Sequence, residues 1–211
     1  MLIVSFFLLI GCSDKNVSEE SVATINDTKE MTRDIIGNNA FLYYKDYDEA
    51  VSFYQKQMGF RNVFEFPGFA MIVQTSPTTF ITIVNDNGRG MHTSEEPKTI
   101  AIALLTDQLD AWYEYAVSQE MDIKNPPKPL ADNPHNGFLV TDPGGYILEF
   151  EHFAPHEENV KFIPLLNASE NIYVPENLET HRPSELGFKA SIYWLYHKDA
   201  KEAADFYRDV M

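Results

Sequence analysis

Two carboxylates on one predicted strand are the first groups of this chain that could do chemistry. The strand covers about residues 146–153 and follows the segment Asp-Pro-Gly-Gly at 142–145, where the proline and glycines favour a tight turn. Because successive side chains of a strand point to opposite faces, Glu149 and Glu151 share one face. We expect the other face to pack in a core, while the glutamates meet a wetter space.

A histidine stands near this acidic strand in the sequence. His135 lies in the segment Asn-Pro-His-Asn-Gly, just before another predicted strand, from which it could approach a cavity. Imidazole and carboxylate groups are common in proton transfer and as metal ligands. The other histidines are expected to be solvated or to cap backbone ends; they are His92, His152, His156, His181 and His197.

Aromatic side chains also cluster on the predicted strands, and their role is open from sequence. They could form a stacking surface for a planar ligand, or they could fill the core between helices and sheet. The cluster consists of Phe41, Tyr43, Phe64, Phe66, Phe69 and Tyr146.

Composition excludes several functions. The 211 residues carry a formal charge of −16, which argues against non-specific binding to DNA, RNA or an anionic bilayer surface. No P-loop, dinucleotide-binding glycine pattern, CxxC motif or serine nucleophile elbow is present. A single cysteine rules out a disulfide within the chain.

That cysteine follows a short apolar segment. Residues 2–10 are almost wholly apolar, too short to span a bilayer but long enough for the core of a signal peptide. The run Leu9-Ile10-Gly11-Cys12 resembles the lipobox of bacterial lipoproteins, although no Lys or Arg precedes it. The resemblance implies a signal peptide at 1–12, lipidation of Cys12 and a polar tether at 13–36. An ordinary secretory signal or a chance apolar terminus is the alternative.

Three stretches of the chain resemble one another. Each has an apolar strand of about six residues, an Asp that could cap a helix, and apolar residues at helical spacing. The capping residues are Asp46, Asp107 and Asp199, of which the first and third have a Glu three residues later, as in a capping box. The first two repeats start 61 residues apart.

Further strands follow the first two helices. In the first repeat we expect them at 62–66, 69–74 and 80–84, and in the second near 121–124, at 137–141 and at 146–152. Each repeat is therefore a βαβββ module. The stretch 154–187 reads as a connector with few periodic signals, and 188–211 reads as the start of a second, truncated domain whose strand and helix lack a sheet.

The paired modules resemble the vicinal oxygen chelate superfamily, which includes glyoxalase I, bleomycin-resistance proteins and extradiol dioxygenases. The resemblance rests on Asp-x-x-x-Ala-x-x-Phe-Tyr-x-x-x-x-Gly-Phe at 46–60 and on Asp-Pro-Gly-Gly-Tyr-x-x-Glu at 142–149. It implies an α+β fold over 37–153, with paired βαβββ modules forming a cupped mixed sheet and helices on the outer face.

The resemblance also implies where ligands would bind. In metal-dependent members, ligands come from the first and last strands of each module, on the inner face. The matching positions here are Glu149, Asn39, Thr82 and, in the first strand of the second module, Ala101 or Ile100. A divalent ion prefers three or four ligands among His, Asp and Glu, and only Glu149 is a strong one. Tyr43 and His135 complete the predicted ligand-binding set.

These residues favour a lipid-anchored protein of the bacterial cell envelope that binds a small organic molecule in the cupped sheet. We do not expect a complete metal site in this domain, although a divalent metal is a possible cofactor. We expect the protein to contact the membrane only through the lipid anchor. The alternative is a metal-dependent lyase, dioxygenase or thiol transferase whose active centre lies in a second domain. A third reading is a partner-binding domain whose cavity is filled by aromatic side chains.

Overall fold

A computed structural model describes residues 36–127 and 133–210 of the chain. The predicted signal peptide, Cys12 and nearly all of the polar tether lie outside these ranges. Within them, no helix combines the length and the apolar character needed to cross a bilayer.

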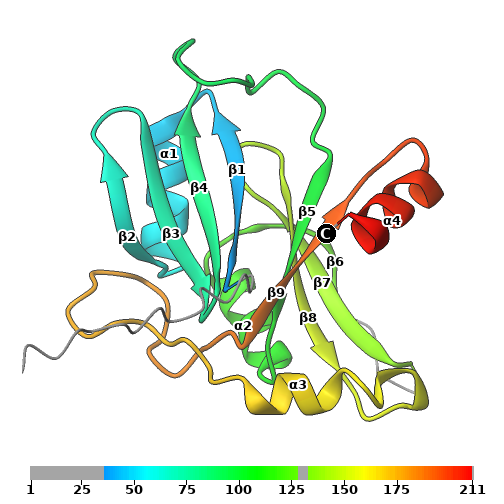
Figure 1. Cartoon of the computed structure of the whole chain (residues 1–211). Helices are drawn as coiled ribbons and strands as arrows, with labels where there is room; N and C mark the ends of the chain where they lie inside the picture. Colours follow the sequence, from blue (N-terminus) through cyan, green and yellow to red (C-terminus); the bar gives the residue numbers. More distant parts are fainter. Residues whose placement is uncertain (1–35, 128–132, 211) are drawn as a thin grey trace, which may run out of the picture. The chain divides into compact units, whose positions relative to one another are not determined.

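The first module forms a four-stranded sheet with one helical segment (Figure 1). Its elements are β1 (Asn38–Tyr44), α1 (Tyr47–Ser52) running into the π-helical turn η1 (Phe53–Gln57), β2 (Arg61–Phe66), β3 (Ala70–Ser76) and β4 (Thr79–Asn85). The strand order is β1-β4-β3-β2, with β1 parallel to β4 and the other pairs antiparallel. We call this sheet A.

The second module repeats this topology. Its elements are β5 (Ile100–Leu105), α2 (Leu109–Ser118), β6 (Asp122–Asn125), β7 (His135–Thr141) and β8 (Ile147–Phe153). Together with β9 (Ala190–Leu195), which comes later in the chain, these strands form a five-stranded sheet, sheet B, of order β6-β7-β8-β5-β9, in which β5 runs parallel to β8. The predicted α+β fold of paired βαβββ modules is confirmed, with two mixed sheets that are not closed.

Two of the three predicted helix caps form. Asp46 Oδ1 accepts the backbone N–H of Glu49 at 3.0 Å, and Asp199 Oδ1 accepts that of Glu202 at 2.9 Å. Asp107 does not cap α2, because its carboxylate pairs with Lys189 instead. Just before α2, the Thr106 hydroxyl accepts the Gln108 N–H at 3.0 Å, and α2 has no side-chain cap.

The core lies between the helices and one face of each sheet. It contains the helix residues Tyr54 and Trp112 and the strand residues Leu42, Ile83 and Phe150, all with no more than 1% exposure. Alternation along the strands sends the neighbouring side chains to the opposite, concave face. That concave face is where the predicted ligand residues belong.

The turn at 142–145 fastens the two modules together. Asp142 is buried, and its Oδ2 accepts hydrogen bonds from the hydroxyls of Tyr44 at 2.5 Å and Tyr54 at 2.8 Å, both from the first module. Its Oδ1 accepts two backbone N–H groups of its own turn. A side chain at Gly144 would meet the Tyr44 ring at 2.5 Å, so this close approach requires glycine.

The stretch 154–187 packs more tightly than its sequence suggests. It contains the short helix η2 (Glu157–Asn159) and α3 (Ile163–Ala168). Arg182 is 3% exposed and donates hydrogen bonds to the carbonyls of Met58, Ile172 and Leu186. Its guanidinium lies 5.0 Å from the Trp112 ring centroid, so the connector is anchored against both helical segments.

The last strand does find a sheet. β9 (Ala190–Leu195) pairs antiparallel with β5, and the Tyr193 hydroxyl donates to the Phe80 carbonyl of β4 at 2.7 Å. The expectation of a strand without a sheet is therefore wrong, while a second domain beginning at 188 stays a prediction. α4 (Ala200–Asp209) follows, and none of its residues is buried.

Candidate ligand-binding site

A cavity of about 570 Å³ opens on the concave face of sheet A. β1, β2, β3 and β4 form its floor, and the segment after β4 forms one side. Its lining is mostly apolar and aromatic: Phe41, Tyr43, Phe64, Phe66, Phe69, Ala70, Ile72, Thr82, Val84, Arg89, Gly90, Met91 and His92.

Aromatic rings of this cavity stand open to solvent. Phe41, Phe64 and Phe66 are 59%, 48% and 58% exposed, and the last two rings meet edge to face at 4.8 Å. Five of the six residues in the aromatic cluster line the cavity. Tyr146 does not line it; this residue is buried in the main core, and its hydroxyl accepts the Tyr43 N–H at 3.0 Å. For Phe41, Phe64 and Phe66, the exposed rings fit a stacking surface better than a filled core, whereas Tyr43 is 7% exposed.

Asn39 and Thr82, two of the predicted ligand residues, meet beside this cavity. The Asn39 side-chain amide donates to the Thr82 hydroxyl at 2.7 Å across the parallel pair β1 and β4. Thr82 lines the cavity, whereas Asn39 does not. The Asn39 amide thus fixes the position of the Thr82 hydroxyl. Of the predicted ligand residues, Tyr43 and Thr82 line the cavity and would contact a ligand there.

Glu149 and His135, the other two predicted ligand residues, lie on the concave face of sheet B. Glu149 pairs with Ala103 in the β5–β8 register. Burial raises the pKa of Glu149, while the nearby His135 and a hydrogen bond from Trp194 of β9 act to lower it. Neither residue lines the sheet A cavity.

Glu151 is the residue of this region whose environment sequence reasoning missed. Its carboxylate is fully buried, with His135 Nδ1 lying 2.7 Å from Oε1. The distance fits an ion pair, but the direction is poor, and neither Glu151 oxygen meets hydrogen-bond geometry with a described residue. Burial, reinforced by Glu149, raises the pKa of Glu151 to about 8. Alternation predicted the face on which Glu151 lies, but nothing in the local sequence indicated that this face is covered.

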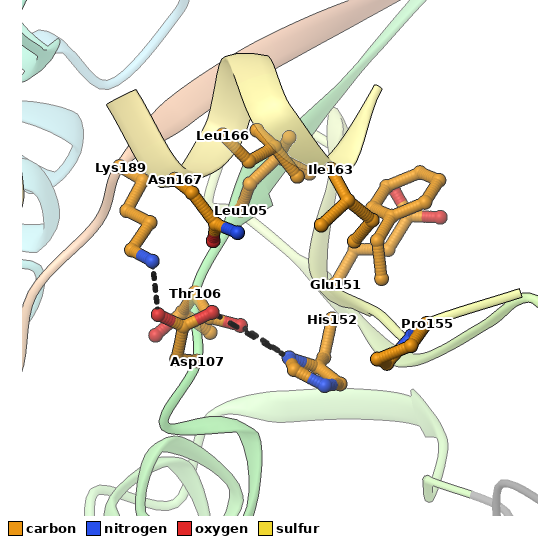
Figure 2. Close-up of a pocket in the computed structure, with 11 residues that line it drawn as sticks. Leu105, Thr106, Asp107, Glu151, His152, Pro155, Ile163, Leu166, Asn167 and Lys189 are labelled. Carbon is orange, nitrogen blue, oxygen red and sulfur yellow. Dashed lines mark hydrogen bonds and ion pairs between the residues drawn. The ribbon is translucent and has the colours of Figure 1, made fainter. Parts of the chain in front are cut away.

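The cover comes from the connector, beside a smaller cavity of about 180 Å³ (Figure 2). Figure 2 shows Asp107 joined by dashed lines to Lys189 and His152, and side chains of α3 on the other side of this cavity. Leu166 of α3 packs with Ala103 and Leu105 on the concave face of β5. This part of the concave face is thus filled by the chain itself.

The donor set on the concave faces does not fit a divalent ion. Asn39 and Thr82 bond to each other, and the predicted first-strand position of the second module holds Ala101, which has no donor. Trp194 lies beside Ala101 in the β5–β9 register and bonds to Glu149. Over residues 36–127 and 133–210, no group of three or more His, Cys, Asp or Glu side chains could hold a metal. The cofactor expectation itself stays a prediction.

Residues 36–150 match the model of the glyoxalase/bleomycin resistance protein/dioxygenase superfamily. The match covers more than half of the chain, which therefore belongs to this family. No curated protein matches the chain.

Solved structures with a similar fold include lactoylglutathione lyase from Agrobacterium tumefaciens, at 18% identity and a TM-score of 0.45, covering 54% of this chain and 90% of that one. A glyoxalase/bleomycin resistance protein/dioxygenase from Nocardioides matches at 18% identity and a TM-score of 0.48, covering 59% and 86%. TioX from Micromonospora sp. ML1 matches at 20% identity and a TM-score of 0.44, covering 56% and 98%. These similarities concern the fold alone.

Proposed function

We propose that this domain binds a small, planar, largely apolar organic molecule in the sheet A cavity, without a metal ion. The observation that carries the proposal is the set of solvent-open rings on the concave face, led by Phe41, Phe64 and Phe66. Leaving such rings in water forgoes the free energy of burial, which a bound planar molecule would recover.

The cavity has the size and chemistry of a small-molecule site. Ligand pockets commonly measure about 300 to 1,000 Å³ and combine apolar walls with a few polar groups. The cavity here measures about 570 Å³, and the Thr82 hydroxyl is fixed on its floor by Asn39. Each ring that stacks on a ligand should contribute on the order of 1 kcal/mol beyond simple burial.

Binding is tested by titration with naphthylmethanol, a neutral planar probe, followed by calorimetry. We expect saturable binding with one site, and we expect Phe64→Ala to weaken it by about tenfold. Phe206→Ala is the matched control, because Phe206 is 50% exposed, as Phe64 is 48% exposed, but lies on α4 outside the cavity lining. Failure of the unaltered protein to bind planar probes, or equal losses in both variants, would refute the proposal.

We further propose that the protein is anchored to the bacterial cell envelope by a lipid on Cys12. The apolar segment 2–10 and the lipobox-like residues before Cys12 support this. Metabolic labelling with an alkyne-tagged fatty acid should mark the protein and move it to the membrane fraction. Cys12→Ser should remove the label and release the protein; label retained in that variant would contradict the assignment.

A further inference from the structure

We propose that the sheet A cavity selects an aromatic carboxylate, with Arg89 at the cavity edge binding the anionic group. The inference rests on the proposed function, which placed a planar molecule among the rings, and adds the charge of that molecule. It starts from an imbalance: the chain carries a formal charge of −16, but no Asp or Glu lines this cavity.

The basic side chains that line the cavity are Arg89 and His92. His92 already has an acidic partner, because its Nδ1 lies 2.8 Å from Oε2 of Glu96. Glu96 is held in place by the backbone N–H of Thr93, and its bond to His92 lowers the pKa of Glu96. The positive charge of His92, when present, is therefore balanced locally.

Arg89 differs from the other arginines that the structure describes. The side chains of Arg61, Arg182 and Arg208 each donate hydrogen bonds to oxygen acceptors. The Arg89 guanidinium instead lies 4.8 Å from the Phe69 ring centroid, and within the described ranges it forms no ion pair. It therefore keeps its donors free for a ligand while its aromatic neighbour orients its plane.

The segment carrying Arg89 is held against sheet A. Asp86 Oδ2 accepts hydrogen bonds from the backbone and side chain of Ser94 at 2.8 and 2.7 Å, which closes the segment into a loop. These bonds also occupy the nearest carboxylate in sequence. Next to Arg89, Gly90 lies so close to Tyr43 that an added Cβ would meet its ring at 2.6 Å. The arginine is thus kept at the edge of the cavity.

This arrangement fits a ligand with a planar apolar body and a terminal carboxylate. The body would lie among the rings of Phe41, Phe64 and Phe66, and the carboxylate would face Arg89. A guanidinium binds carboxylates through two parallel N–H···O bonds, which position the anion as well as attract it. A neutral molecule of the same shape would gain the stacking contacts without this pair.

The test compares naphthoate with naphthylmethanol in calorimetric titrations at neutral pH and low salt. We expect the unaltered protein to bind naphthoate about tenfold more tightly, with the difference shrinking as salt is added. Arg89→Gln should bind both probes equally, at the affinity of the alcohol. Arg61→Gln removes the same charge from sheet A outside the cavity lining and should keep the preference.

Three outcomes would overturn the inference, and they are distinguishable from failure of the proposed function. Equal binding of the two probes by the unaltered protein leaves the cavity a ligand site but removes the charge selection. Equal effects of the Arg89 and Arg61 variants indicate a general field rather than a contact. Binding of neither probe refutes the proposed function itself, and the inference with it.

Discussion

Replacing Glu151 by Gln should make the protein more stable at alkaline pH. The folded state raises the pKa of the Glu151 carboxyl from 4.5 to about 8, through burial first and the charge of Glu149 second. A carboxyl whose pKa is raised on folding holds its proton more tightly in the folded state. Ionising this carboxyl therefore costs more free energy in the folded state than in the unfolded state. This loss of stability is absent below about pH 4.5 and grows as the pH rises towards 8. Glutamine keeps the shape and cannot ionise, so the variant escapes this penalty.

The magnitude follows from the difference between the two pKa values. Each tenfold change in proton affinity corresponds to about 1.4 kcal/mol. Ionisation of Glu151 can therefore lower the free energy of unfolding by at most about 3 kcal/mol between about pH 5.5 and about pH 8.5. His135 Nδ1 lies 2.7 Å from Oε1 of Glu151, and the His135 side chain is 48% exposed, so a polar neighbour and nearby solvent both reduce the penalty. We expect the free energy of unfolding of the Gln variant to exceed that of the unaltered protein by about 2 kcal/mol at about pH 8.5.

Urea unfolding across this pH range measures the effect. Glu114→Gln is the matched control, because Glu114 is exposed on α2, and its pH profile should follow that of the unaltered protein. The reasoning is refuted if the Glu151 variant is less stable at about pH 8.5, or if its advantage does not grow with pH.

Three further variants test the contacts that hold the two modules, the connector and β9. Asp142→Asn should lower the free energy of unfolding by about 2 to 4 kcal/mol, since both buried tyrosine hydroxyls lose a charged acceptor; urea unfolding no different from the unaltered protein would contradict this. Arg182→Met should cost about 3 kcal/mol by leaving buried carbonyls without donors. Hydrogen exchange should then quicken in the connector, and unchanged protection there would count against the anchoring role. Tyr193→Phe should cost about 1 kcal/mol by removing the hydroxyl bond to β4, and an unfolding midpoint identical to that of the unaltered protein would show the bond to be dispensable.

Local sequence patterns predicted the architecture because each module repeats the same local rules. The caps at Asp46 and Asp199 depend on residues three positions apart, so the spacing alone indicated them. The prediction of a cap at Asp107 was wrong, and local spacing could not have shown why. Its partner Lys189 comes from a segment 82 residues away, and a long-range ion pair displaced a local one.

The candidate site was only partly predictable. Alternation assigned side chains to one face or the other, but it did not say which face of a strand would be covered. Phe41 proved open, whereas Tyr146, from the same predicted cluster, proved buried. Glu151 is buried on a face where the connector packs against β5, and the connector has no periodic pattern that would place it.

The anchoring of the connector separates two boundaries that are often assumed to coincide. Residues 36–150 match the family model, but the packing around α2 extends beyond them. Phe188 stacks on Trp112 at 4.3 Å, and Arg182 covers the same indole, so a chain cut after 153 would bare the centre of α2. A segment of this chain that is grafted into another protein would therefore need to include both modules, the connector and β9.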